Sequence, residues 1–406
     1  MENRAFINLE TSVGLGRQRS SEKTIVNGEQ KTTIIKAITL VGFTASVFYH
    51  YVLSNYNGLG YYPYNTFLFN PADKFNDFYN IYKATIDLNP YAAPVSVYFP
   101  FTFIVVYLFT LLHNDHLALY VFTFIFLAFL ITYVYRAIPS VKKSEKSMDT
   151  FILIFMSYPV LFNLDRGNWE SVLFVFLVLF LYYYQKKDDL KSVFFLSLAI
   201  SMKLYPAVFI VLFLADKKYR NILYTGISVI VITMLSAFML EGGVAKSLLG
   251  LKNNLENFRN AYIMSDHGLQ HNASLYGVIK IMKLPLNYYS VLAVVIFALI
   301  AAYVILKEDI YWKRVTFLVL SMILLPQVSY DYKLIHLFIP LLLFLNHAKP
   351  CKSDLVFALL WGLLLIPKDY YLISGDISIA VLFNPLIMVM MISMILLDRH
   401  ALKVAQ

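Results

Sequence analysis

The sequence predicts an all-α, polytopic integral membrane protein with about 11–13 membrane helices, some of them broken or re-entrant. Hydrophobic residues make up 59% of the 406-residue chain, and the mean hydropathy is +0.64. A soluble domain has only about 45–50% apolar residues. The apolar residues also gather in runs close to the roughly 20 residues that a helix needs to cross a bilayer. The polar sequence between these runs is too short to enclose so many apolar helices as a soluble core.

The expected spans follow from these apolar runs, taken in order along the chain. They are residues 33–53, 116–135, 149–164, 170–185, 220–240, 287–306, 313–328, 332–346, 354–367 and 377–397. Residues 97–112 and 190–215 contain shorter runs. In the second of these, Pro206 is expected to begin a new helix, because proline is tolerated in the first turn. A hairpin with Lys203 at its outer apex is therefore predicted.

The distribution of basic residues sets the expected orientation. Most of the 34 Lys and Arg residues lie in short segments beside apolar runs, such as residues 136–147. The positive-inside rule places these segments in the cytoplasm. The longest outer loops are then 54–96 and 241–286. This orientation allows only an odd number of crossings between residues 97 and 135, so we expect 97–112 to enter the membrane without crossing it.

The remaining segments are short. Residues 1–32 are mixed in charge and are expected to form a flexible cytoplasmic tail, with a second tail at 398–406 and one transmembrane domain over 33–397. The net charge of +9 is explained by the cytoplasmic loops, so nucleic acid is not an expected partner. A single cysteine, Cys351, excludes an internal disulfide and a cysteine-based metal site.

Asp77 is the strongest candidate for a catalytic base. It lies in the first outer loop, where a carboxylate is hydrated enough to ionise and near enough to meet a lipid headgroup. Asp73 and Asp87 are the other carboxylates of this loop, and for them a role in solvating the loop is the better interpretation. The same structural role is the alternative for Asp77.

Two cations are candidates for binding a phosphate. Arg166 precedes Gly167 and Asn168 at an outer turn between two spans, where a guanidinium can clamp phosphate in bidentate fashion. The alternative is a plain turn in which Asn168 caps the next helix. Lys203 is a lone charge in apolar sequence, which in a membrane protein suggests function, although its amine could instead extend to the interface.

Two further polar groups lie at predicted outer junctions. A new apolar segment follows a polar stretch and begins with His271, Asn272 and Ser274. Asp331 and Lys333 stand between two spans, and a paired acid and base at an interface is their structural alternative. All these groups fall on one predicted side of the membrane. An acid with several cations and aromatic residues suits a sugar substrate that has a phosphate leaving group.

The chain resembles glycosyltransferase family 87, a branch of the GT-C superfamily that includes mannosyltransferases. The resemblance covers roughly residues 33–397 and rests on the order of short motifs. These are Asp77-Phe78-Tyr79, Asn89-Pro90-Tyr91, Tyr98-Phe99-Pro100, Arg166-Gly167-Asn168, Lys203-Leu204-Tyr205-Pro206, His271-Asn272-Ala273-Ser274-Leu275 and Ser329-Tyr330-Asp331-Tyr332-Lys333-Leu334. Many relatives carry a Gly-Gln element at Arg166-Gly167-Asn168 and a double proline at Phe99-Pro100.

The resemblance implies a GT-C architecture and an inverting transfer of a sugar from a polyprenyl-phosphate donor to a lipid or glycan acceptor. The site would face outward, in a bacterial inner membrane. It also implies that Asp77 is the base, and that Lys203, His271, Asn272 and Ser274 contact the donor. The chemistry requires no cofactor, although a divalent metal is compatible with it. Mannose does not follow, because of the two departures from the family pattern.

Two other functions use the same features. A lipid-linked glycan transporter or flippase would use Lys203 and Asp331 as coupling charges, but it would be expected to show an inverted repeat, and the sequence has none. An O-antigen ligase or polymerase would be expected to have an arginine-rich outer loop. The loop 241–286 contains only Arg259.

Overall fold

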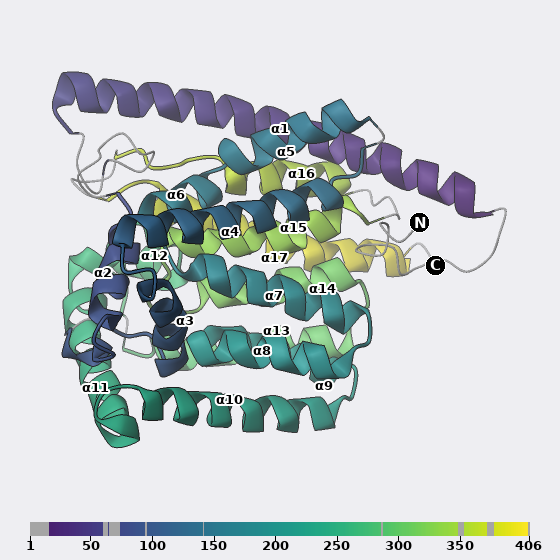
Figure 1. Ribbon diagram of the computed structural model, residues 1–406. Coiled ribbons are helices and arrows are strands. Elements are labelled where there is room, and N and C mark those ends of the chain that lie inside the picture. Colours follow the sequence, from purple (N-terminus) through teal and green to yellow (C-terminus); the bar gives the residue numbers. More distant parts are fainter. Residues whose placement is uncertain are drawn as a thin grey trace.

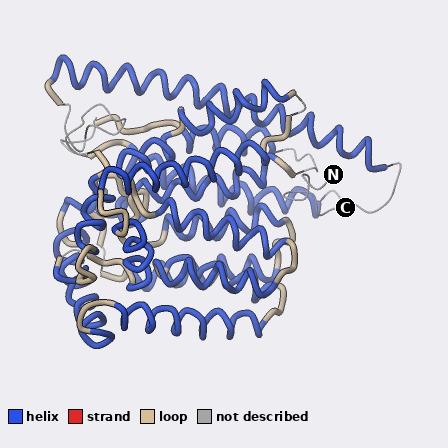
Figure 2. Tube along the Cα trace, in the orientation of Figure 1, coloured by secondary structure: helices blue, strands red, loops and turns tan. Residues whose placement is uncertain are grey.

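The computed structural model describes residues 16–59, 64, 74–93, 96–140, 142–285, 287–347, 353–371 and 377–404, with side chains described between residues 27 and 398. Within these ranges the chain is helical and has no β-strand (Figure 2), which confirms the all-α class. An antiparallel bridge joins Asn272 and Tyr330. Asp73 and Cys351 lie outside the described residues.

The helices have the following bounds. They are α1 (Gly16–Asn57), α2 (Asn76–Thr85), η2 (Pro90–Ala92), α3 (Pro100–Thr110), α4 (Asp115–Ala137), α5 (Lys143–Phe155), α6 (Tyr158–Arg166), α7 (Glu170–Gln185), α8 (Asp189–Met202), η3 (Tyr205–Phe209), α9 (Ile210–Ala215), α10 (Tyr219–Met239), α11 (Gly243–Phe258), η4 (Arg259–Ile263), η5 (Asp266–Leu269), α12 (Leu275–Ile281), α13 (Tyr289–Leu306), α14 (Tyr311–Leu324), η6 (Asp331–Leu337), α15 (Phe338–Leu345), α16 (Asp354–Leu365) and α17 (Ala380–Val404).

The long helices lie side by side, and their connections fall at two opposite ends (Figure 1). One end holds the start of α1, the end of α17 and the connections from α4 to α5, α7 to α8 and α9 to α10. These are the connections rich in Lys and Arg. The other end gathers α2, α11 and α12, which belong to the two long loops predicted outside, together with α3 from the segment 97–112.

Within the described ranges, five helices are long and apolar enough to cross a membrane. They are α1 within Asn27–Asn57, α4, α10, α13 and α17 as far as Asp398. A sixth span results if α5 and α6, which meet at a 54° bend, are counted as one. Other apolar runs form shorter helices, because a polar turn or a proline divides them. The count is therefore smaller than the number of apolar runs in the sequence.

Two short apolar segments lie next to the site described below. Helix α3 has 11 residues, so it is about 16 Å long and too short to cross a hydrocarbon layer of about 30 Å. Helix α8 ends at Met202, and Pro206 stands in the first turn of the following η3. Lys203 therefore lies at the turn of a broken helix pair, as the sequence predicts.

The centre of the bundle is formed by α14 and α15. Every side chain from Val315 to Leu324 is buried, as are those from Phe338 to Leu342. The outer helices show the opposite pattern, because Phe238 of α10 and Leu299 of α13 are 73% and 67% exposed. Exposed apolar faces of this kind suit contact with lipid. The molecule thus combines an apolar core with an apolar outer surface.

Candidate active site

Asp77 lies on helix α2, which an aromatic cluster holds against the bundle. Phe78 is fully buried and stacks on Trp169 with ring centroids 5.5 Å apart. The backbone N–H of Phe75 donates to the carbonyl of Asp165 at 2.7 Å, which ties the start of α2 to the end of α6. Phe75 itself has a left-handed backbone, with φ 59°. These contacts place the Asp77 carboxylate beside the turn between α6 and α7.

That turn depends on Gly167. Gly167 ends α6 in the left-handed region at φ 59°, and a Cβ atom there would lie 2.9 Å from the Cβ of Phe78. Glycine adopts this conformation at little cost and leaves room for the neighbouring helix. The tight turn lets its two neighbours, Arg166 and Asn168, present their side chains to the same carboxylate.

Arg166 and Asn168 bind the two oxygens of Asp77. Arg166 Nη2 donates to Oδ1 at 2.9 Å, and Asn168 Nδ2 donates to Oδ2 at 2.6 Å. The side-chain oxygen of Asn168 accepts from the backbone N–H of Glu170 at 3.0 Å, which fixes its orientation. The side chains of Asp77 and Arg166 are 23% and 12% exposed. Because each carboxylate oxygen can accept two hydrogen bonds, Asp77 keeps capacity for an incoming hydroxyl.

A buried carboxylate, Glu170, organises the neighbouring cations. Lys203 Nζ lies 2.5 Å from Glu170 Oε1, and the Tyr205 hydroxyl donates to Oε2. His336 Nε2 lies 2.9 Å from the same Oε2. Glu170 is fully buried and opens α7, so its charge faces the positive end of that helix. It thus connects α7 with the turn after α8 and with η6.

A second lysine gives this cluster an excess of positive charge. Lys333 Nζ lies 4.5 Å from the ring centre of Tyr205 and donates to the carbonyl of Val328 at 3.3 Å. Lys203 Nζ lies over the ring of Tyr98 at 4.5 Å. Lys203 pairs with Glu170, whereas Lys333 has no carboxylate at ion-pair distance among the described residues. An anionic ligand would restore the charge balance.

The loop that carries Tyr98 is anchored by helix α11. Asn254 Nδ2 donates to the carbonyls of Ala93 at 2.7 Å and Ser96 at 3.1 Å. The Tyr91 hydroxyl donates to the carbonyl of Tyr98 at 3.0 Å. Helix α11 therefore holds the loop in a defined position beside Lys203.

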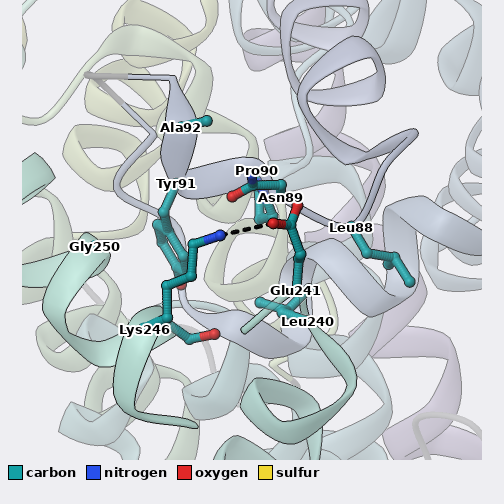
Figure 3. Close-up of a pocket in the computed structure, with 10 residues that line it drawn as sticks. Leu88, Asn89, Pro90, Tyr91, Ala92, Leu240, Glu241, Lys246 and Gly250 are labelled. Carbon is teal, nitrogen blue, oxygen red and sulfur yellow. Dashed lines mark hydrogen bonds and ion pairs between the residues drawn. The ribbon is translucent and has the colours of Figure 1, made fainter. Parts of the chain in front are cut away.

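A hollow of about 150 Å³ lies between residues 88–92 and the start of α11 (Figure 3). Tyr91 forms part of its wall, and Lys246 pairs with Glu241 at 2.7 Å across it. Both of these charged side chains are about half exposed. None of the residues that line the hollow belongs to the Asp77 or Glu170 groups, so it is separate from the candidate site.

Asn272 and Ser274 join two segments of backbone. Asn272 Oδ1 accepts from the N–H groups of Ser274 and Ser329, at 3.1 and 3.0 Å. Its Nδ2 donates to the carbonyls of Gly268 and Gln327. Ser274 Oγ accepts from the Gly277 N–H at the start of α12. These hydrogen bonds hold residues 271–274 against 327–331, and the side chains point into the protein.

His271 and Asp331 form a separate buried group with Asp369. His271 Nδ1 lies 3.4 Å from Asp369 Oδ1, and Tyr158 donates to Asp331 Oδ2 at 2.8 Å. Burial and the nearby Asp369 raise the pKa of Asp331. Burial lowers the pKa of Lys368 to about 8. Asp331 contacts Tyr158, and Lys333 contacts Val328 and Tyr205, so these two residues do not form the pair considered from the sequence.

The predicted residues therefore fall into two groups in the structure. Asp77, Arg166 and Asn168 meet directly, and Lys203 and Lys333 lie beside them around Glu170. The residues His271, Asn272, Ser274 and Asp331 lie in or beside the separate buried group. Sequence reasoning missed Glu170, His336 and Asp369 as members of either group. For Glu170, the signal in the sequence is its place as a charged residue at the boundary of an apolar run.

Comparison with known proteins identifies one family. The family model described as Glycosyltransferase family 87 matches residues 97–328, which is more than half of the chain. The matched part includes Arg166, Glu170 and Lys203 but not Asp77. No curated protein and no solved structure matches the chain significantly.

Proposed function

The chain belongs to glycosyltransferase family 87, and on that basis we propose that it moves a sugar from a polyprenyl-phosphate donor to a hydroxyl of a lipid or glycan acceptor. The transfer inverts the anomeric centre and takes place at the outer face of the membrane. The observation that carries the proposal is the partly exposed Asp77 carboxylate, oriented by Arg166 and Asn168 beside a cluster with surplus positive charge.

Asp77 acts as the general base in this proposal. The acceptor hydroxyl gives its proton to Asp77 while its oxygen forms a bond to the anomeric carbon. The bond from that carbon to the phosphate oxygen breaks on the opposite side. Because polyprenyl phosphate leaves as an anion, its departure requires no proton.

The positive charge beside Asp77 supports the other half of the proposed reaction, the departure of the donor phosphate. Arg166 is paired with Asp77 and Lys203 with Glu170, while Lys333 lies nearby and donates to the carbonyl of Val328. Cations in a poorly hydrated site stabilise a departing phosphate more strongly than they would in water. An uncompensated charge in this environment is costly until its counter-ion arrives. The donor phosphate would supply that counter-ion.

The test has two parts: the glycans of a deletion strain, and the binding of polyprenyl phosphate to the purified protein. A deletion strain should lose one sugar from its lipid-linked glycans or surface polysaccharide and accumulate the acceptor, as read by mass spectrometry. The purified protein should bind polyprenyl phosphate, and Lys333→Met should weaken that binding by about 10-fold or more. Lys252→Met, an exposed lysine on α11, is the matched control and should bind as the wild type does.

Two results would contradict the proposal. One is unchanged glycan composition in the deletion strain. The other is movement of an intact lipid-linked glycan across proteoliposomes without transfer of a sugar, which would indicate a flippase.

A further inference from the structure

A buried cluster of three possible metal ligands lies apart from the proposed transfer site. It consists of His271, Asp331 and Asp369, which we call the buried triad. The three come from distant segments: the turn before α12, the start of η6, and the connection from α16 to α17. All three are buried, with 3%, 1% and 0% of their surface exposed. Lys203 and Glu170 belong to neither the triad nor its hydrogen bonds.

The spacing of the triad suits a small cation. One nitrogen or oxygen atom from each residue lies within 4.8 Å of the other two. His271 Nδ1 and Asp369 Oδ1 are 3.4 Å apart. A tetrahedral metal with bonds of about 2.1 Å places its ligand atoms about 3.4 Å from one another. The third ligand would need to move by roughly 1 Å to complete the same geometry.

The neighbouring groups hold the two carboxylates in place. Asp331 accepts hydrogen bonds from Tyr158 at 2.8 Å and Asn384 at 3.3 Å. Asp369 Oδ1 accepts from Ser378 Oγ at 3.0 Å. Metal-binding carboxylates are commonly oriented by a surrounding layer of this kind.

One carboxylate oxygen of the triad is buried without a hydrogen bond of ordinary geometry. Among the described residues, none donates such a bond to Asp369 Oδ2, although His271 and Tyr158 lie beside this carboxylate. The nearby cation Lys368 does not fill this role, because its ammonium donates to the carbonyls of Leu363 and Ile366, both at 2.7 Å. A buried carboxylate oxygen without a donor is costly. A bound cation would remove that cost.

We propose that His271, Asp331 and Asp369 bind one divalent transition-metal ion, of the class of Zn²⁺ or Mn²⁺. An imidazole with two carboxylates favours these ions over Mg²⁺ and Ca²⁺, which prefer oxygen ligands alone. The site is structural, because it is closed and buried. It fastens the connection between α16 and α17 to the paired segments 271–273 and 329–331.

The test uses the full-length protein in detergent, stripped with a chelator and then reloaded. Elemental analysis should find about one equivalent of Zn²⁺ or Mn²⁺ per chain, and the metal should raise Tm by about 3 °C or more. Pulsed electron paramagnetic resonance of the Mn²⁺-loaded protein should show coupling to one imidazole nitrogen. Mg²⁺ at the same concentration should have little effect.

Two variants locate the ion. Asp369→Asn should weaken Mn²⁺ binding by about 100-fold or more, because it removes a charged ligand. The control is Asp266→Asn. Asp266 lies in the same predicted outer loop as His271, and its side chain is 87% exposed, so this variant should bind Mn²⁺ as the wild type does. If Asp369→Asn does not fold, the nitrogen coupling in the wild type decides the question. Binding well below one equivalent, or bound Mn²⁺ without nitrogen coupling, overturns the proposal.

Discussion

Asp77 and Arg166, which are 89 positions apart in the sequence, form an ion pair of 2.9 Å at the end of the bundle that carries the two long loops. The pair joins the first loop to the turn between α6 and α7. It therefore connects the proposed base to the part of the chain that matches the family model, although Asp77 lies outside that match.

Replacing Asp77 with Asn should lower turnover by about 100-fold or more, the usual scale of general-base effects. The amide has nearly the same shape and keeps one oxygen that can accept from Arg166, so the protein should fold and bind polyprenyl phosphate. Asp87→Asn, an exposed residue of the same loop, is the control and should keep full activity. Near-normal transfer by purified Asp77→Asn protein would rule out Asp77 as the base.

Replacing Lys203 with Met should destabilise the protein by about 3 kcal/mol, because it removes the lysine that pairs with the buried Glu170 carboxylate. Adding Glu170→Gln should recover part of that loss. Unfolding in denaturant measures both effects. Independent, additive losses in the double variant would show that the two residues are not coupled.

Replacing Gly167 with Ala should cost about 2–3 kcal/mol of stability. Alanine would have to adopt the left-handed backbone of Gly167, and its Cβ atom would lie 2.9 Å from the Cβ of Phe78. Gly243→Ala is a matched control, since it has φ 68° but no atom within 4 Å of the added Cβ, and it should cost about 1 kcal/mol. Equal costs for the two variants would mean that the contact with Phe78 relaxes freely.

Single cysteines should report the orientation of the bundle. In a Cys351→Ser background, cysteines at Asp87 and Asp266 should react with a membrane-impermeant thiol reagent on intact cells. A cysteine at Ser144, beside the basic segment 136–147, should react only after lysis. All three positions are exposed in the structure. Labelling of residue 144 on intact cells would place the α4 to α5 connection outside.

Features set by local sequence were predicted well. The turn at Gly167, the break at Pro206 and the apolar runs each follow from the chemistry of neighbouring residues. The pairing of Glu170 with Lys203 could not be predicted, because it depends on how α7 and α8 pack. At the sequence level Glu170 is only an acid before an apolar run, and Asp369 is only a loop carboxylate.

The pairing of Glu170 with Lys203 also limits how this region can change in length. Glu170 is the first residue of α7, which has 16 residues, and Lys203 follows α8, which has 14. The two helices lead the chain away from the site and back again. Inserting one residue within either helix would rotate the following turn by about 100° and shift it by about 1.5 Å, which separates the two charges. Insertions and deletions should therefore be tolerated at residues 186–188, at the opposite end of this helical hairpin. Within α7 or α8 they should destabilise the protein.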